Sequence, residues 1–266
     1  LSVPRYYAKK RLGQNFIKSA GTIRKLVELI NSQRGERIIE IGPGRGAITL
    51  RLAESGARIT AVEYDRDLIP YLTVLLEDQP NVTVVQGDFL EYEPDFAPFK
   101  LVGNLPYNIS SPVIDWTVRH HDNITSAVYM LQKEVALRLA SSPGHKDWSS
   151  LAIFSQLYFD IRVCFDVSPD HFVPRPKVTS TVVVLTPKSP PDIRSYDLFE
   201  KVVRQSFAFR RKTLLNNLVP SIVPESGQLT EILTFLGLDS RVRAEQVSTE
   251  MFLELTNQLT ARKILS

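Results

Sequence analysis

Cysteine is almost absent from this sequence. Cys164 is the single cysteine, so an internal disulfide and a cysteine-based metal cluster are both excluded. The four histidines show no spacing typical of metal ligands and are interpreted as loop or surface residues: His120, His121, His145 and His171. We therefore predict no metal site, and a reducing cytoplasm is the simplest location for the protein.

Long apolar runs are absent too. No run of apolar residues is long enough to span a bilayer, which argues against a membrane partner. The basic start of the chain lacks the apolar segment of a secretory signal. Since the chain begins with Leu1 rather than Met, the sequence leaves open whether a further segment precedes it.

Acidic residues are missing from the first 25 positions, although the net charge of the whole chain is only +3. That stretch carries seven basic residues instead: Arg5, Lys9, Lys10, Arg11, Lys18, Arg24 and Lys25. A second basic cluster is formed by Arg210, Arg211 and Lys212. Local positive charge attracts polyanions such as nucleic acid, while a solvated surface is the plainer explanation of a charge run.

Strand-like and helix-like segments alternate through about residue 165, which is typical of a doubly wound parallel sheet in an α/β fold. Seven strands are predicted, at 37–42, 58–63, 82–87, 99–103, 126–131, 162–165 and 181–185. No helix separates the last two, so they are predicted to form an antiparallel pair. The predicted helices are 22–30 with Thr22 as its cap, one after Gly46, 67–77, one beginning near Ser111, 133–140 and 151–159.

The last part of the chain shows only helical patterns. Helices are predicted at 198–207, 212–218, 229–236, 242–247 and 249–265, behind a proline-rich linker at 189–192. The sequence thus predicts three parts: a basic N-terminal arm at 1–20, an α/β domain at 21–188 and a small all-helical domain at 189–266.

A glycine-rich turn follows the first predicted strand. Gly42, Gly44 and Gly46 have G-x-G-x-G spacing, which differs from the G-x-G-x-x-G of dinucleotide binders. Glycines here let a ligand approach the backbone closely. Glu63 ends the next strand, where a carboxylate can accept both hydroxyls of a ribose. Glu40, inside the first strand, favours an adenosine with a charged amino-acid tail over a pyrophosphate, which acids would repel.

Asp88 and Phe89 follow the third strand. An acid and an aromatic at this place can bind an adenine amino group and flank its ring. A helix-capping Asp beside a core Phe is the alternative, and the two residues alone do not decide between these interpretations.

The tetrapeptide Asn104-Leu105-Pro106-Tyr107 stands at the carboxyl end of the fourth strand, where open α/β sheets place their ligand crevice. Pro106 cannot donate to a sheet ladder, so the strand should end there. The tetrapeptide offers an amide, a freed carbonyl and an aromatic face. This set suits holding a flat heteroaromatic ring and accepting hydrogen bonds from its amino group. A strand-ending turn with a packed Tyr is the plainer alternative.

Taken in order, these motifs resemble those of the ribosomal RNA adenine dimethyltransferases, most closely the bacterial small-subunit branch. Three further stretches match: Gln14-Asn-Phe-Ile17, Phe172-Val-Pro-Arg-Pro176 and Phe207-Ala-Phe-Arg-Arg-Lys212. Family members often carry Leu where this chain has Ile17. The resemblance implies a Rossmann-like class I methyltransferase sheet with S-adenosylmethionine as the cofactor.

The resemblance also implies a role for each site residue. Those implied to bind the cofactor are Asn15, Ile17, Glu40, Gly42, Gly44, Glu63, Asp88, Phe89 and Asn104. In the catalytic tetrapeptide, the Asn104 side chain and the Leu105 carbonyl would accept the amino hydrogens of the target adenine, beside Pro106. Tyr107 and Phe172 would stack on its ring. RNA phosphates would bind Lys9, Lys10, Arg11, Arg210, Arg211 and Lys212.

The implied target is a pair of adjacent adenines in a hairpin near the 3′ end of small-subunit (16S) ribosomal RNA, methylated by a monomer within a pre-assembled 30S particle. One alternative is the sister enzyme, which dimethylates large-subunit (23S) RNA and gives antibiotic resistance. Another is a binding module without turnover, such as a mitochondrial transcription-factor relative or an assembly factor. A nicotinamide-dependent dehydrogenase is disfavoured by the glycine spacing.

Overall fold

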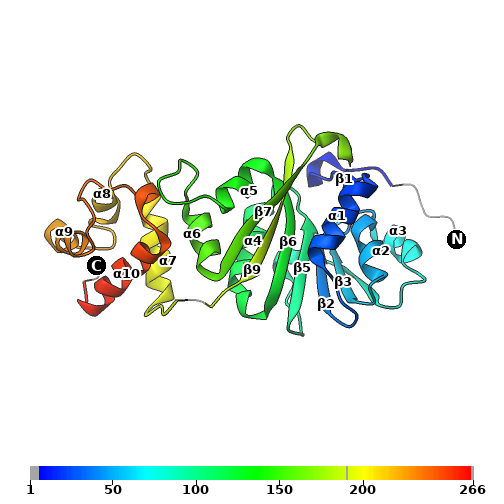
Figure 1. The fold of residues 1–266 in the computed structure, drawn as a ribbon, viewed down its shortest axis with the longest axis horizontal. Coiled ribbons are helices and arrows are strands. Elements are labelled where there is room, and N and C mark those ends of the chain that lie inside the picture. Colours follow the sequence, from blue (N-terminus) through cyan, green and yellow to red (C-terminus); the bar gives the residue numbers. More distant parts are fainter. Residues whose placement is uncertain (1–5, 190, 265–266) are drawn as a thin grey trace. The chain divides into compact units, whose positions relative to one another are not determined.

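The computed structural model of the chain describes residues 6–189 and 191–264 (Figure 1). By the contacts between its residues, the chain divides into two compact units. The first comprises residues 1–136 and 159–188, and the second comprises residues 137–158 and 189–266. This division assigns residues 137–158 to the second unit, whereas the boundary predicted from the sequence places them in the α/β domain.

A seven-stranded sheet forms the centre of the first unit. In spatial order its strands are β4 (Val82–Gln86), β3 (Arg58–Glu63), β2 (Arg37–Ile41), β5 (Phe99–Asn104), β6 (Ile124–Gln132), β9 (Ser180–Pro187) and β7 (Phe159–Val167). The strand β9 runs antiparallel to both β6 and β7, and the remaining pairs are parallel. The predicted α/β class, with seven strands and an antiparallel last pair, is confirmed.

Helices pack on both faces of this sheet. They are α1 (Ala20–Ile30), α2 (Ala47–Ala53), α3 (Ile69–Leu75) and α4 (Ser110–Arg119), with 3₁₀ turns η1 (Lys10–Leu12), η2 (Phe89–Glu91), η3 (His121–Asn123) and η4 (Pro169–His171). Successive residues of a strand point to opposite faces. In β6, Val128 and Met130 join the core that holds α1 and α2, whereas the Tyr129 hydroxyl lies 2.7 Å from Thr117 Oγ1 of α4.

The cap of α1 differs from the prediction. Ser19, not Thr22, caps the helix, because the Ser19 hydroxyl accepts a hydrogen bond from Thr22 N at 3.3 Å. Thr22 is buried in the first turn, and its hydroxyl lies 2.9 Å from His171 Nδ1. Ser and Thr are both good caps, so the local sequence alone did not separate them.

A small second sheet was not predicted at all. The strand β1 (Phe16–Ile17) pairs antiparallel with β8 (Phe172–Val173). Each strand has two residues, too short for a period-two pattern to appear in the sequence. This pairing joins the Gln14-Asn-Phe-Ile17 stretch to the Phe172-Val-Pro-Arg-Pro176 stretch.

The second unit is helical. Its helices are α6 (Ser150–Tyr158), α7 (Tyr196–Ser206), α8 (Leu214–Leu218), α9 (Ser226–Phe235) and α10 (Thr249–Ala261), and α5 (Lys133–Leu139) crosses the division between the units. The prediction of a helix at 242–247 is wrong, because only the 3₁₀ turn η5 (Ala244–Gln246) forms there. Thr213 caps α8 by accepting from Asn216 N at 3.2 Å, which leaves Arg210 to Lys212 in a loop. Among the described residues, no helix combines the length and apolar character needed to cross a membrane.

Candidate active site

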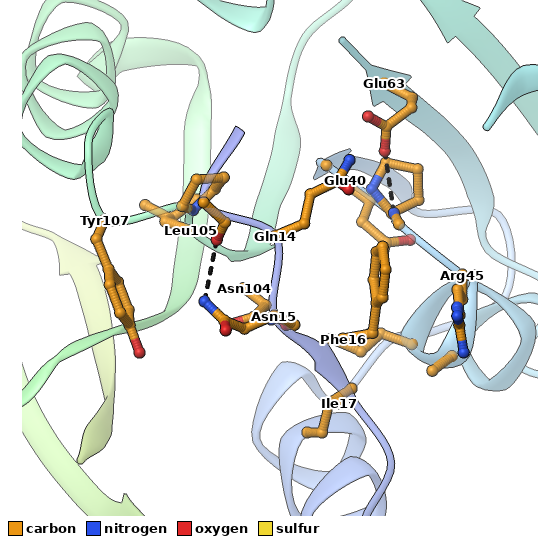
Figure 2. Close-up of a pocket in the computed structure, with 17 residues that line it drawn as sticks. Gln14, Asn15, Phe16, Ile17, Glu40, Arg45, Glu63, Asn104, Leu105 and Tyr107 are labelled. Atoms are coloured by element: carbon orange, nitrogen blue, oxygen red, sulfur yellow. Dashed lines mark hydrogen bonds between the residues drawn. The ribbon is translucent and has the colours of Figure 1, made fainter. Parts of the chain in front are cut away.

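The candidate site lies at the carboxyl ends of β2, β3 and β5. The order of the sheet reverses at β2, because β3 and β4 extend it on one side and β5 and β6 on the other. Such a switch point opens a crevice at the strand ends. Gly42, Glu63 and Asn104 stand at these ends and line one cavity (Figure 2).

The glycine turn between β2 and α2 has a backbone that glycine adopts most readily. Gly42, Gly44 and Gly46 have φ angles of 61°, 56° and 70°. A Cβ atom at Gly44 would lie 2.9 Å from the ring of Phe16, so a side chain there would collide with the segment that covers the turn. The Gly44 N–H donates to Glu63 Oε2 at 3.1 Å. The turn is therefore held close to the end of β3.

Two buried acids lie beside this turn. Glu63 Oε1 accepts from Asp65 N at 2.8 Å, and burial raises the pKa of Glu63. Glu40 is 2 % exposed, and its Oε2 has no hydrogen-bond partner among the described residues. Burial raises the pKa of Glu40 to about 7, and the charge of Glu63 adds to this rise. An unpartnered buried oxygen is unfavourable, so a donor or cation entering the cavity would stabilise Glu40.

Asn104, the last residue of β5, has a defined amide orientation. Its Nδ2 donates to the Asn15 carbonyl at 2.9 Å, and a carbonyl oxygen can only accept. Asn104 Oδ1 is left as an acceptor with no donor among the described residues. Leu105 donates its N–H to the Met130 carbonyl at 3.1 Å, and no described residue donates to its own carbonyl. Two acceptors from consecutive residues are thus available in a cavity that both residues line.

The strand β5 ends at Asn104, two residues before Pro106, and so does not continue past the proline, as predicted. The Pro106 carbonyl accepts from Ile109 N at 3.1 Å and from Ser110 Oγ at 3.2 Å, which starts α4. Tyr107 is half-buried, and its hydroxyl lies 3.4 Å from Ser180 Oγ at the start of β9. Figure 2 shows Tyr107 on one side of the cavity and Glu63 and Arg45 on the other. Its ring therefore forms part of the cavity wall.

A second chamber of about 350 Å³ adjoins the first cavity and shares Gln14, Gly42, Glu63 and Pro106 with it. Asp88 and Phe89 both line this chamber. Asp88 Oδ1 accepts from Leu90 N at 2.9 Å and so caps η2, while the Phe89 ring packs on Trp116 with centroids 4.6 Å apart. The capping and core interpretation is thus confirmed, and the same two residues also face a cavity.

Phe172 is not placed as the stacking prediction requires. Its side chain is 2 % exposed and belongs to the core with Ile17 and Leu26, and it lines neither chamber. The pairing of β8 with β1 carries Phe172 into this core, opposite Ile17. In this structure Phe172 therefore anchors the segment over the site, and its ring would have to leave the core to meet a ligand.

Comparison with known proteins supports the motif-based prediction. Residues 6–261 match the family model described as "Ribosomal RNA adenine dimethylase". The chain belongs to this family. It is 42% identical over 261 residues to "Ribosomal RNA small subunit methyltransferase A" of Pseudomonas aeruginosa, a match that covers 95% of this chain and 94% of the relative.

Two solved structures are similar over nearly the whole chain. A dimethyladenosine transferase from Plasmodium falciparum has a TM-score of 0.81 and 25% identity, with 94% of this chain and 98% of that one covered. The 23S rRNA methyltransferase ErmE has a TM-score of 0.73 and 28% identity, with 92% of this chain and 100% of that one covered. The fold and the dimethylase family predicted from the sequence are both confirmed.

In this dimethylase the N-terminal arm is fastened to a buried acid, Asp65. The Tyr6 hydroxyl, Lys9 Nζ and Gln14 Nε2 all donate to its carboxylate, Lys9 at 2.6 Å and Gln14 at 3.0 Å. Burial opposes the charge on Asp65, but the hydrogen bonds from Lys9 and Tyr6 outweigh it and lower its pKa to about 2. The ionised carboxylate of Asp65 is therefore the hub of the arm, because three side chains of the arm donate to it.

Arg45 holds the arm at a second point. Its Nη2 donates to the Tyr6 carbonyl at 2.7 Å, and its guanidinium lies 4.9 Å from the centroid of the Phe16 ring. Phe16 in turn covers Gly44. Sequence reasoning missed Tyr6, Arg45 and Asp65. Two features of the sequence could have indicated them: Arg45 lies inside the glycine turn, and Asp65 lies two residues beyond Glu63. Both residues line cavities in the folded protein.

The predicted RNA-binding residues of the arm differ in their availability. Lys9 pairs with both Asp65 and Asp67, each at 2.6 Å, so in this structure its ammonium is engaged by two acids of the same unit rather than free for a phosphate. Arg11 is exposed and lines the second chamber. The side chain of Lys10 lies outside the described residues. In the second unit, Arg210, Arg211 and Lys212 are all exposed.

Proposed function

We propose that this dimethylase transfers methyl groups from S-adenosylmethionine to the exocyclic amines of two adjacent adenines in a hairpin near the 3′ end of small-subunit (16S) ribosomal RNA. It would act as a cytoplasmic monomer in ribosome biogenesis, on a pre-assembled 30S particle. The observation that carries the proposal is the pair of free acceptors, Asn104 Oδ1 and the Leu105 carbonyl, in a cavity that also holds buried acids.

The residues of the two chambers fit S-adenosylmethionine. The unpartnered oxygen of Glu40 suits the ammonium group of the methionine end. Glu63, which lines both chambers, suits the ribose hydroxyls, and Asp88 with Phe89 suits the adenine in the larger chamber. When bound, S-adenosylmethionine supplies an activated methyl group on a sulfonium.

The two acceptors address the main chemical difficulty. An adenine amine is a poor nucleophile because its lone pair is delocalised into the ring. Asn104 Oδ1 and the Leu105 carbonyl would accept its two hydrogens, favour a tetrahedral nitrogen and stabilise the positive charge that develops there. Holding the amine in line with the methyl group contributes roughly 7 kcal/mol or more. The methylated amine releases its proton readily, so no histidine or cysteine base is required.

The target adenine must leave its stack to reach this cavity. The half-buried Tyr107 ring offers one stacking face for such a base. Asn15 lies next to the same position, because its carbonyl holds the Asn104 amide. The arm and the tetrapeptide would thus form opposite parts of one binding site for an unpaired adenine.

The choice of ribosomal subunit rests on the relatives. The match to a protein named as a small-subunit methyltransferase is 42% identical and nearly full-length, against 28% for the 23S enzyme ErmE. The large-subunit reaction is the second candidate, because ErmE shares the fold across this chain.

One experiment tests the proposal and its rival together. Tritiated S-adenosylmethionine is incubated with the protein and either small or large subunits from a strain that lacks the modification, and the modified nucleotide is then mapped. We expect two dimethylated adjacent adenines in small-subunit RNA and no label in large-subunit RNA. Label confined to large subunits would establish the rival, and label on neither would refute both.

A further inference from the structure

Phe209 is an apolar side chain left in solvent beside the basic cluster of the second unit. It lies in the loop 207–213 between α7 and α8, and 56% of it is exposed. Lys212 Nζ lies 4.3 Å from the centroid of its ring, a cation–π contact. Arg210 and Arg211 follow it directly and are exposed as well. The loop thus presents an aromatic ring and three cations together.

The exposure of Phe209 is not the result of a loose backbone. Its carbonyl accepts from Lys212 N at 2.9 Å and from Asn217 Nδ2 at 3.2 Å. Asn217 is buried, and it also donates to the Ser206 carbonyl at 2.8 Å, which fixes the end of α7. Arg210 Nη2 donates to the carbonyl of Lys146, which ties the loop to the neighbouring segment of the same unit. These hydrogen bonds fix the backbone of the loop, so an ordered segment carries the exposed ring.

Single exposed aromatic residues are common, so exposure alone carries no weight. Phe235 of the same unit makes the comparison direct. It is 66% exposed and has Arg262 5.9 Å from its ring centroid, but Arg262 is itself within 3.9 Å of the Glu231 carboxylate. Phe209 is therefore distinguished by the three consecutive cations that follow or cover it.

This combination fits one kind of partner. Cations bind the phosphates of a single strand, and an adjacent aromatic ring stacks on one of its bases whatever the base identity. We infer that Phe209 is a stacking site for an unpaired RNA base, with Arg210, Arg211 and Lys212 on the flanking phosphates. The inference rests on the proposed function, because it names a part of the RNA that the second unit holds in addition to the target adenine.

The test measures the binding of the full-length protein to a short fluorescein-labelled oligoadenylate and to an abasic ribose-phosphate oligomer of the same length. We expect Phe209→Ala to weaken oligoadenylate binding about tenfold and Phe209→Trp to retain it. Phe209→Leu should resemble Phe209→Ala, because leucine is apolar but has no stacking face. Phe235→Ala is the matched control and should bind as the parent protein does.

Two further readouts separate stacking from charge. On the abasic oligomer the Phe209→Ala variant and the parent protein should bind equally. The dependence of affinity on salt should also be unchanged by Phe209→Ala, since no phosphate contact is lost. An unaltered affinity for oligoadenylate, or a loss that persists on the abasic oligomer, overturns the inference.

The outcome is independent of the proposed reaction. Methyl transfer by the parent protein to small subunits is measured separately, so a protein that methylates them without any role for Phe209 refutes the stacking site alone. A protein that binds RNA through Phe209 but methylates only large subunits refutes the proposed target alone. In the methylation assay, Phe209→Ala should raise KM for small subunits and leave kcat unchanged.

Discussion

Two segments of this chain, the N-terminal arm and the 207–213 loop, are basic in sequence. In the folded protein their cations differ in whether an acid pairs with them. In the N-terminal arm, Lys9 is paired with Asp65 and Asp67, and the arm lies across the cavity at the ends of the strands. In the 207–213 loop, Arg211 and Lys212 remain exposed. Lys9 thus fastens the arm beside the site, whereas Arg211 and Lys212 are available to a polyanion.

The comparison shows what decides the role of a basic residue. The partners of Lys9 lie 56 and 58 positions along the chain, at the end of β3. A charge run in the sequence does not reveal such distant acids. We therefore expect changes in the arm to affect the chemistry and the stability of the first unit, and changes in the loop to affect RNA affinity.

The largest effect is expected at Asn104, where the arm meets the catalytic tetrapeptide. Asn104→Ala removes one of the two acceptors and the bond to the Asn15 carbonyl. We expect kcat for methyl transfer to fall roughly 100- to 1000-fold, the usual loss for one such electrostatic group, in single-turnover assays on small subunits. Asn216→Ala, which removes an exposed amide of the second unit, is the control and should be neutral. Full activity of Asn104→Ala would remove the basis of the proposed mechanism.

Glu40 shows the cost of a buried acid with an unpartnered oxygen. The folded protein keeps the Glu40 proton up to a pKa of about 7, whereas the unfolded chain releases it near the ordinary value of 4.5. This contribution therefore favours folding below pH 4.5 and is lost as the pH rises to 7, by about 3 kcal/mol at most. Glu40→Gln should flatten the fall in unfolding free energy over that range, as measured by urea titration. An unchanged slope would contradict the assignment.

Asp65 shows the opposite case of a paired acid. With a folded pKa of about 2, its ionised form contributes stability above the unfolded pKa, and this contribution is lost as the pH falls from about 4 toward 2. At neutral pH, Asp65→Asn should lower the unfolding free energy by roughly 2 kcal/mol and the melting temperature by roughly 5 °C. Asp67→Asn, whose exposed carboxylate pairs with the same lysine, should cost less than about 1 kcal/mol. Equal losses in both variants would argue against Asp65 as the hub of the arm.

The smallest expected effect is on the salt dependence of RNA binding, and measuring it compares the two basic clusters directly. Arg211→Ala should reduce the slope of log affinity against log salt by about 0.7 for single-stranded RNA, the value expected for one lost phosphate contact. Lys9→Ala should leave this slope unchanged, because its charge is already neutralised by two carboxylates. Fluorescence anisotropy at several salt concentrations measures both. A reduced slope for Lys9→Ala would show that the arm releases its lysine to RNA.

The sequence predicted the first unit most accurately at positions where the chemistry of one residue, or of a few neighbours, fixes the local backbone. The end of β5 follows from Pro106, which has no N–H to donate, and the glycine turn follows from three backbone positions with positive φ. The boundaries of α1 and of the 242–247 segment were less well predicted. In the first case two neighbouring residues were both able to cap, and in the second a short helical pattern formed only a 3₁₀ turn.

Long-range pairings could not be predicted in this way. Phe172 was assigned to the adenine pocket, yet the β1–β8 pairing buries it against Ile17. The hub at Asp65 and its contact with Tyr6 join segments that no short pattern connects. Local propensity acts between neighbours in the chain, whereas these contacts depend on where the folded backbone brings distant residues.

The seven strands of the large sheet and the helices between them, the glycine turn at the end of β2, and the family of the chain all followed from its sequence, because periodicity, proline, glycine and short motifs act over a few residues. The tertiary structure alone decided which acids neutralise Lys9, which way the Asn104 amide faces and that the Phe172 ring is buried. Each of these is set by a partner from a distant segment, and burial and pairing depend on three-dimensional proximity rather than on distance along the chain.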